Sequence, residues 1–493
     1  MKNYDIIVVG CGVVGAAVAY ELSKYELSVG IIEKENDLAT GATRANSAII
    51  HAGFDPMPGS LMAKLNVRGS ELTEEIAKKL DVPYERTGAL VIALSEEDLS
   101  TLGELFERGR ANGVRDLKIL SPEEVRLMEP GIAPGVLGAL YAPTSAIISP
   151  WEYCLALAET AVVNGAEINF NCELKDIKRE ETSCGAVWHV STSGGEFFAP
   201  LIVNAAGVNA LDIHDMVSEK KHISKPRIGE YYLLDKAEGS RVSRTIFQCP
   251  GVNGKGVLVS KTTHGNLIVG PTSRGTSADD TACTSDGLAF IKERATMSVP
   301  GIDFRKNIRN FAGLRATTDS DDFIIEEAAE GFIDCAGICS PGLSAAPAIG
   351  EYVVELVQKS LASSTKGDLG SPLRKRENFK EERKKISFNA LSDDEKAELV
   401  KNNPSYGRVI CRCETITEGE ILASFNTPIP PSSIDGIKRR CGTGMGRCQG
   451  GFCGPRIAEL LVEELGYDVD DVVMDRSGSE MFFGMTKGGK QHV

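Results

Sequence analysis

Aromatic residues are scarce in this sequence, at 6% of 493 residues with two tryptophans, and no heptad repeat is present. No pattern therefore identifies an oligomer interface, although an oligomer stays open. Long uninterrupted hydrophobic runs are also missing, because the most apolar late helix expected, 345–361, carries Glu351 and Glu355. We expect that helix to pack against the protein, so no transmembrane segment is predicted.

An excess of positive charge is absent as well. The chain has 54 Lys and Arg against 69 Asp and Glu, a formal net charge of -15. This balance argues against nucleic acid and anionic membrane surfaces as partners. The sequence begins without a basic segment leading into an apolar one, so no signal peptide is expected. The thirteen cysteines are then predicted to be reduced thiols or metal ligands in a cytoplasm rather than a disulfide framework.

The first thirty-odd residues carry the clearest motif. An apolar run at 6–9 predicts a buried parallel strand. Gly10-x-Gly12-x-x-Gly15 follows it directly, before a helical pattern and a second apolar strand that ends in an acid. The glycines allow a tight turn, close approach of backbone N–H groups to a pyrophosphate, and close packing of helix on strand. The acid, Glu33, can accept from both ribose hydroxyls and disfavours a 2′-phosphate, so the motif predicts FAD or NAD rather than NADP.

Three later stretches are rich in small residues: 39–53, 201–207 and 337–345. Small residues permit close backbone approach to a large flat ligand, so we place the flavin at 39–53. The apolar strand at 201–207 ends in small residues and predicts a second backbone contact. A helix that starts near Ser344 could direct its dipole at the flavin edge and stabilise the anionic reduced flavin.

Five cysteines lie in the glycine-rich loops of the last hundred residues: Cys411, Cys413, Cys441, Cys448 and Cys453. Four thiolates brought together in this way form a soft-metal site. Structural zinc is the alternative, but its paired cysteines usually have about two to four residues between them. A [2Fe-2S] cluster suits a flavin neighbour, because it accepts singly the electrons that a flavin takes as a pair. Cys441 is the expected spare, because the other four form two symmetric pairs.

Two resemblances follow from these motifs. Residues up to about 360 resemble the D-amino-acid-oxidase-type FAD superfamily, above all its anaerobic-type bacterial glycerol-3-phosphate dehydrogenases and L-2-hydroxyglutarate oxidases. Residues 405–465 resemble the bacterioferritin-associated-ferredoxin-like [2Fe-2S] domain, whose ligand positions match Cys411, Cys413, Cys448 and Cys453. The segments that carry the resemblances are 10–33, 45–53, 58–61, 270–272, 340–347, 411–414, 438–440 and 446–453.

The resemblance implies non-covalent FAD, a substrate held between a sheet domain and the flavin, and oxidation of a secondary alcohol. It also implies complexes that pass electrons to a second flavoprotein or to quinone. The residues expected to contact FAD are Gly10, Gly12, Val13, Val14, Gly15, Glu33, Lys34, Thr43, Ala45, Asn46, Ser47, Ala206, Gly207, Gly313, Gly342, Leu343 and Ser344.

The pattern changes to alternating strands between about 226 and 320, which predicts an antiparallel sheet. The expected fold is therefore α/β: a Rossmann-like FAD-binding domain with an inserted antiparallel-sheet substrate domain, plus a small helical [2Fe-2S]-binding C-terminal domain. The expected division is 1–80, 140–225 and 320–362 for the FAD-binding domain; 81–139 and 226–319 for the substrate or cap domain; 363–404 for a linker with charged, solvated helices at 377–388 and 393–402; 405–475 for the [2Fe-2S]-binding domain; and 476–493 for a tail.

Oxidation of an alcohol needs a base for the hydroxyl proton and cations for an anionic substrate. His51 is the candidate base, although it could instead only hydrogen-bond the isoalloxazine. Arg315 and Lys261 are the candidate anion ligands, with a surface ion pair as the alternative. Tyr231 and its neighbour Tyr232 lie on one alternating strand, so only one of them faces the pocket.

The leading hypothesis is an FAD-dependent dehydrogenase of sn-glycerol 3-phosphate that passes electrons through a [2Fe-2S] cluster. A second hypothesis is an L-2-hydroxyglutarate, other 2-hydroxyacid or amino-acid dehydrogenase, whose substrate carboxylate Arg315 could bind. A third is an electron-transfer subunit of a multi-flavoprotein complex, with Lys438, Arg439 and Arg440 as a docking patch beside the cluster.

Overall fold

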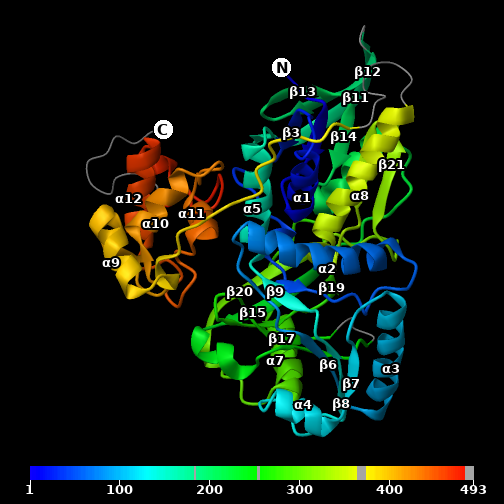
Figure 1. The fold of residues 1–493 in the computed structure, drawn as a ribbon, viewed down its shortest axis with the longest axis vertical. Helices are drawn as coiled ribbons and strands as arrows, with labels where there is room; N and C mark the ends of the chain where they lie inside the picture. The colour runs from blue at the N-terminus through cyan, green and yellow to red at the C-terminus, as the bar shows by residue number, and fades with distance from the viewer. Residues whose placement is uncertain (183–184, 252–255, 364–372, 483–493) are drawn as a thin grey trace. The chain divides into compact units, whose positions relative to one another are not determined.

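The computed structural model describes residues 1–182, 185–251, 256–363 and 373–482. It divides into two units (Figure 1): the first comprises Met1–Lys34 and Leu38–Arg383, and the second comprises Glu35–Asp37 and Lys384–Val493. Among the described residues, no helix has both the length and the apolar character needed to cross a bilayer.

A six-stranded sheet forms the centre of the first unit. Its five neighbouring strands are parallel, and the edge strand β21 runs antiparallel to β22. The strands β2, β3 and β14 are buried over their whole length, as their continuous apolar runs predict for a sheet covered on both faces. In order across the sheet, the strands are β10 (Glu167–Asn169), β3 (Val29–Ile32), β2 (Ile6–Val9), β14 (Leu201–Asn204), β22 (Phe332–Ala336) and β21 (Ile324–Ala329).

Five helices accompany this sheet. The helix α1 (Val13–Leu22) packs against α5 (Pro150–Val163) and α8 (Gly342–Ser363), and α8 packs against α2 (Leu61–Lys79). Nine of the ten residues of α1 are buried, so this helix lies within the core rather than on its surface. The short helix α6 (Ala210–Val217) contacts β22.

The first unit also contains a nine-stranded sheet. All its strand pairs are antiparallel except the pair of β16 with β6. Alternate residues of β6 enter different hydrophobic clusters: Val91 joins Leu102 and Leu105 of α3, and Leu90 joins Ile291 of α7. Successive strand residues point to opposite faces, so α3 and α7 cover opposite faces of the sheet. The elements are β19 (Arg274–Gly275), β15 (Arg227–Leu234), β18 (Leu267–Gly270), β17 (Leu258–Lys261), β16 (Thr245–Gln248), β6 (Ala89–Ala93), β8 (Gly138–Ala142) and β7 (Lys118–Leu120), with β20 (Asn307–Arg315) paired to β15 and the helices α3 (Glu96–Ala111), α4 (Pro122–Met128) and α7 (Ser285–Ser298).

Two smaller sheets complete the first unit. One contains β1 (Lys2–Asn3), β13 (Gly195–Ala199), β12 (Gly185–Thr192) and β11 (Leu174–Thr182); the other contains β4 (Ile49–Ile50), β9 (Ala146–Ile148) and β5 (Tyr84–Glu85). The expected α/β class, with an inserted and mainly antiparallel sheet, is confirmed.

The expected charged helix at 377–388 is wrong. The chain there forms no α-helix, and two of its charged side chains, Glu381 and Arg383, bind other parts of the first unit. Glu381 accepts from Lys79 at 2.8 Å, and Arg383 Nε lies 2.6 Å from Glu159 Oε2 with 13% of its side chain exposed. These long-range ion pairs hold an extended path that the local charge pattern does not reveal. The expected linker start at 364–372 and the tail after 482 lie outside the described residues.

The second unit is small and mainly helical, as expected. Its helices surround one core that contains Ile421, Ile437, Ile457 and Leu461, together with Cys411, Cys441 and Cys453. The elements are α9 (Asp393–Asn402), which confirms the second charged helix, the strands β23 (Val409–Cys411) and β24 (Ile416–Thr417), and the helices α10 (Glu418–Phe425), α11 (Ile434–Cys441) and α12 (Gly454–Leu465).

Candidate functional site

The glycine turn after β2 leaves no room for a side chain at Gly10 or Gly15. A Cβ added at Gly15 would lie 2.0 Å from the Gly10 carbonyl oxygen, and one at Gly10 would lie 2.7 Å from the Ala205 carbonyl oxygen. Gly10 also has a φ of 94°, which disfavours any L side chain, and Gly12 caps the start of α1. The turn therefore has the geometry that a dinucleotide pyrophosphate requires at a helix N-terminus.

Two polar side chains bind the backbone of this turn. Glu33, at the end of β3, accepts from the Cys11 N–H at 2.7 Å and is 7% exposed. Thr43 Oγ1 accepts from the Val13 N–H at 3.0 Å. These bonds fix Glu33 and Thr43 beside the first turn of α1, where the sequence places ribose and phosphate contacts. Lys34 follows Glu33 and is exposed.

The small-residue stretch after Gly41 lies against β20. A Cβ at Gly313 would lie 1.8 Å from the Ala45 carbonyl oxygen, so only glycine permits this approach. Asn46 stabilises the stretch by donating to the carbonyls of Ala42 at 3.0 Å and Thr43 at 2.8 Å. Gly313, Ala45 and Asn46, predicted from distant parts of the sequence, thus come together.

The start of α8 meets the same stretch. The Ser344 hydroxyl accepts from the His51 N–H at 2.8 Å, and α8 begins at Gly342 followed by Leu343. Ala206 and Gly207 follow the carboxyl end of β14, next to Ala205 and its approach to Gly10. The carboxyl ends of β2, β14 and β22 therefore gather most of the predicted cofactor residues at one edge of the sheet, where open α/β sheets bind ligands.

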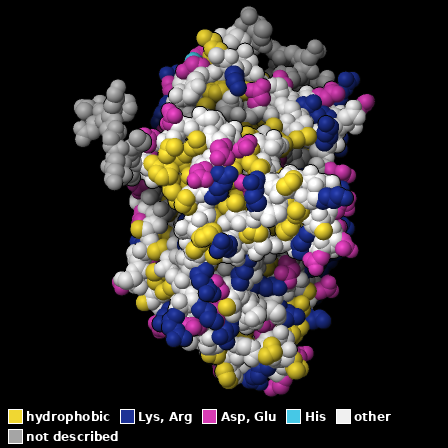
Figure 2. Space-filling view, turned by 90° about the vertical axis from the view of Figure 1, so that its left-hand side faces the viewer, with side chains coloured by type: hydrophobic (Ala, Val, Ile, Leu, Met, Phe, Trp, Pro, Cys, Tyr) yellow, Lys and Arg dark blue, Asp and Glu magenta, His cyan; other side chains and the backbone are white. Residues whose placement is uncertain are grey.

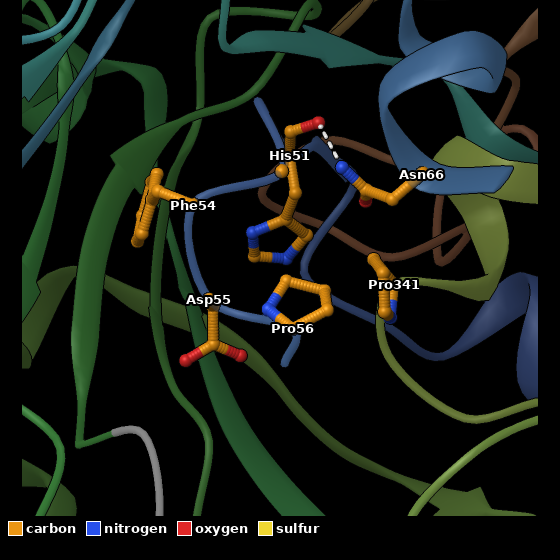
Figure 3. A pocket seen from close by; sticks show the side chains of 7 residues that line it. His51, Phe54, Asp55, Pro56, Asn66 and Pro341 are labelled. Atoms are coloured by element: carbon orange, nitrogen blue, oxygen red, sulfur yellow. Dashed lines mark hydrogen bonds between the residues drawn. The ribbon is translucent and has the colours of Figure 1, made fainter. Parts of the chain in front are cut away.

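The side chain of His51 lies in a polar and aromatic surrounding (Figure 3). Its Nε2 lies 3.5 Å from Ser340 Oγ, and its ring centroid lies 5.6 Å from that of Phe247. Its carbonyl accepts from Asn66 Nδ2 at 3.1 Å, the bond drawn in Figure 3. A cavity of about 10 Å³ adjoins the ring, with Pro341 in its lining, which is room for about one water. The histidine is thus positioned from both sides of its backbone, with one ring nitrogen facing a hydroxyl. Ser340, Phe247 and Asn66 were not predicted, because no local pattern in the sequence links them to His51.

The two neighbouring tyrosines of β15 face opposite ways. Tyr231 is 4% exposed, stacks on Phe311 at 4.9 Å, and its hydroxyl lies 3.1 Å from Ser47 Oγ. Tyr232 instead packs edge-on against Phe304 at 5.0 Å, within the cluster that includes α7. Tyr231 is therefore the tyrosine on the Ser47 side of the sheet.

Arg315 is the last residue of β20, and one of its guanidinium nitrogens is buried. Its Nη2 donates to the Thr272 carbonyl at 3.2 Å, whereas its Nη1 is buried with no hydrogen-bond partner among the described residues. Gly229 leaves space for this guanidinium, since a Cβ there would lie 2.6 Å from Nη2. A buried guanidinium N–H without an acceptor costs free energy, so the site suits an anionic ligand.

Lys261 has an anionic partner within the protein. Its ammonium group forms an ion pair with Glu85 of β5, and 25% of its side chain is exposed. This arrangement is the surface ion pair considered as the alternative for Lys261. Its role in substrate binding stays a prediction.

The cysteines of the second unit form two pairs. The thiols of Cys413 and Cys448 are exposed and lie 3.6 Å apart, whereas Cys411 and Cys453 are each 1% exposed and hydrogen-bonded to each other. Among the described residues, no three or more His, Cys, Asp or Glu side chains surround a single ion position. Two thiol pairs suit two irons, each held by two cysteines, and so fit a [2Fe-2S] cluster.

Cys441 is separate from both pairs. Its thiol donates to the Ile437 carbonyl at 3.3 Å within α11, and burial raises its pKa to about 11. A thiol held neutral by its own helix is a poor metal ligand, because metals bind the thiolate.

The predicted basic docking patch is wrong for two of its three residues. Arg439 and Arg440 are 6% and 3% exposed, and both bind the buried carboxylate of Asp37, with Nη2 and Nη1 at 2.8 and 2.9 Å from Oδ2. The remaining residue, Lys438, lies 3.8 Å from Asp435. Asp37 was missed because its partners lie 402 and 403 positions away along the chain.

Asp37→Asn should destabilise the second unit by about 3–5 kcal/mol, because the change removes the carboxylate that two buried guanidiniums share. Of the two, Arg439 keeps Asp475, 3.0 Å from its Nη1. Burial opposes ionisation of Asp37, but Arg440 and Arg439 lower its pKa from 3.8 to about 2. The native carboxylate therefore contributes its full stability above about pH 4 and loses it as the pH falls towards 2. Urea unfolding at pH 7 measures the difference, and the same change at exposed Asp470 should cost less than about 0.5 kcal/mol. Equal losses would contradict the role of Asp37.

With this geometry in place, comparison with known proteins decides the family. Residues 5–356 match the model of the FAD dependent oxidoreductase family. The chain belongs to this family. Residues 409–463 of this FAD-dependent oxidoreductase match the BFD-like [2Fe-2S] binding domain, which contains both thiol pairs. The enzyme is therefore a flavoprotein with FAD and a [2Fe-2S] cluster as its cofactors.

Three known proteins are similar to this oxidoreductase. A glycerol 3-phosphate dehydrogenase of Caloramator mitchellensis is 47% identical over 493 residues, covering 99% of this chain and 100% of that one. The FAD-bound L-alpha-glycerophosphate oxidase of Mycoplasma pneumoniae superposes with a TM-score of 0.71 at 31% identity, over 78% of this chain and 98% of that one. An L-2-hydroxyglutarate dehydrogenase of Escherichia coli is 30% identical, over 54% of this chain and 63% of that one.

Cys448→Ala should abolish the visible absorbance of the cluster, whereas Cys441→Ala should leave it intact. Loss of one exposed ligand opens the coordination of one iron, whereas the Cys441 thiol donates to the Ile437 carbonyl of its own helix. Iron and sulfide analysis of the two purified variants provides the measurement. Retention of the cluster in Cys448→Ala, or its loss in Cys441→Ala, would show that the ligand assignment is wrong.

Proposed function

We propose that this oxidoreductase oxidises sn-glycerol 3-phosphate to dihydroxyacetone phosphate and passes the electrons through its [2Fe-2S] cluster. The observation that carries the proposal is the full-length likeness to the Caloramator glycerol 3-phosphate dehydrogenase, which spans both domains. The alternative, an L-2-hydroxyglutarate or other 2-hydroxyacid dehydrogenase, has weaker support, because those relatives match only about half of this chain.

FAD bound at the glycine turn would supply the acceptor for the hydride that leaves the carbinol carbon. The residues fitted to hold it are those of the turn, Glu33 and Thr43, and the small-residue approach of Ala45 to Gly313. The rest of the chemistry falls to side chains: one must take the hydroxyl proton, and one must bind the anionic end of the substrate.

His51 takes the hydroxyl proton in this proposal. Its backbone is fixed by Ser344 and Asn66, so the imidazole is held without needing the substrate to order it. The Ser340 hydroxyl, 3.5 Å from Nε2, orients the ring. Arg315 binds the phosphate, whose oxygens supply the acceptor that Nη1 lacks in the described protein.

Tyr231→Phe should lower kcat/KM for sn-glycerol 3-phosphate about 10-fold, and Tyr232→Phe should leave it unchanged. Only the Tyr231 hydroxyl reaches Ser47, and loss of one hydrogen bond in a closed site costs about 1–1.5 kcal/mol. Steady-state kinetics of both variants with a dye acceptor provide the comparison. Equal kcat/KM values for the two variants would show that the Tyr231 hydroxyl does not contribute to the site.

The proposed substrate is tested by the initial rate of dye reduction with sn-glycerol 3-phosphate, L-2-hydroxyglutarate and glycerol, each at equal concentration. The proposal expects turnover with the first and little with the others. Preference for the hydroxyacid would transfer support to the alternative. The electron-carrying domain implies a redox partner. We propose that this partner is a second flavoprotein or a quinone-linked subunit. A cytoplasmic location stays a prediction.

A further inference from the structure

The exposed thiol pair of the second unit has two arginines and one aromatic side chain beside it. Arg412 and Arg447 each directly precede one of the two cysteines, Cys413 and Cys448, and all four are exposed. Phe452 is 55% exposed, and the Arg412 guanidinium lies 4.4 Å from its ring centroid. We call Arg412, Arg447 and Phe452 the thiol rim.

The thiol rim has the composition of a docking surface. Phenylalanine and arginine are enriched where protein partners bind, and a large exposed aromatic ring is an apolar anchor. The stack of Arg412 on Phe452 orders both side chains in advance, which lowers the entropy cost of binding. Local groups of Lys and Arg occur on this chain of net charge -15, as Figure 2 shows for one face.

The thiol rim also lies where electrons can leave. Of the two thiol pairs, Cys411 and Cys453 face the core of the second unit, and Cys413 and Cys448 face solvent. A partner seated on Phe452 would approach the cluster from its exposed side. With Arg439 and Arg440 buried against Asp37, Arg412 and Arg447 are the exposed arginines that adjoin the cysteines in sequence.

We propose that the thiol rim docks an electron-accepting protein that presents an acidic face with an apolar centre. The inference rests on the proposed function for its source of electrons. Oxidation of one alcohol releases two electrons and two protons; each electron passes from the cluster to one acceptor molecule, so two acceptors are reduced, and both protons go to solvent. Complementary charge speeds the encounter of such partners and makes it sensitive to salt.

A matched pair of acceptors tests this directly: cytochrome c, which is basic, and succinylated cytochrome c, in which the lysines carry carboxylates. The holoenzyme is first reduced by sn-glycerol 3-phosphate, and acceptor reduction is followed by stopped flow over a range of NaCl concentrations. The rate with the succinylated form should fall at least several-fold as salt rises, whereas the rate with the native form should rise. Arg412→Glu with Arg447→Glu should reverse both trends, and Arg412→Lys with Arg447→Lys should preserve them.

Binding of the succinylated cytochrome to oxidised holoenzyme, measured by calorimetry without turnover, should weaken at least 10-fold in the Glu variant and in Phe452→Ala. Bleaching of the flavin by substrate and the cluster spectrum should not change, which separates failure at the thiol rim from failure of the proposed substrate. Salt trends that follow the net charge in every variant would overturn the proposal. So would arginine-dependent binding to phosphatidylglycerol vesicles in place of the cytochrome, which would assign the thiol rim to a membrane.

Discussion

Replacement of His51 by glutamine should slow flavin reduction by sn-glycerol 3-phosphate about 10²–10⁴-fold, the usual contribution of a general base. Glutamine can keep a polar contact to Ser340, but it cannot take the hydroxyl proton at neutral pH. The bound FAD should remain, because the His51 N–H that bonds the Ser344 hydroxyl belongs to the backbone and is kept in the variant. Anaerobic stopped-flow absorbance measures the rate of flavin bleaching.

The control is His222→Gln, at a half-exposed position near Asp319, which should bleach at the native rate. The alternative role for His51, a hydrogen bond to the isoalloxazine, makes a different prediction. In that case His51→Gln would shift the flavin spectrum and lower the rate less than about 10-fold. Such a result would contradict the assignment of His51 as the base.

Arg315→Gln should lower kcat/KM for sn-glycerol 3-phosphate about 10–150-fold, mainly through KM. The reason is the loss of a charge-assisted hydrogen bond from the buried Nη1, worth about 1.5–3 kcal/mol. Steady-state kinetics with sn-glycerol 3-phosphate and with glycerol separate this effect from damage to the fold. Glycerol lacks the phosphate, so the variant and the native enzyme should use it equally poorly. An equal loss on both substrates would exclude Arg315 as the phosphate ligand.

The sequence reveals the parts of the site whose residues are contiguous. The contact that excludes a Cβ at Gly15 is made by the Gly10 carbonyl of the same turn, so it can be predicted from neighbouring residues, whereas the contact at Gly10 is made by Ala205, far away in sequence. Strand alternation indicates that Tyr231 and Tyr232 face opposite sides, but only the packing of Ser47 and Phe304 tells which side is which.

Long-range ion pairs explain most of the failures. Arg439 and Arg440 lie in a run typical of a solvated basic patch. Both are buried instead, because they form ion pairs with Asp37, which is far away in sequence. The stretch 377–388 is charged like a surface helix, yet Arg383 and Glu381 have partners in the first unit that hold it extended. Lys261, whose role in substrate binding stays a prediction, also has its partner on another strand, Glu85. Charge patterns in a sequence show which residues can form ion pairs, but not with which partner.

The central claim is that electrons from the substrate enter at FAD and reach the cluster in the same chain. Anaerobic titration of the holoprotein with sn-glycerol 3-phosphate, followed by flavin absorbance and by electron paramagnetic resonance of the cluster, tests it most directly. The account predicts that both centres become reduced, with full reduction at about 1.5 equivalents of substrate, because FAD holds two electrons and the cluster one. A flavin that bleaches while the cluster stays oxidised, or a flavin that stays yellow, would contradict it.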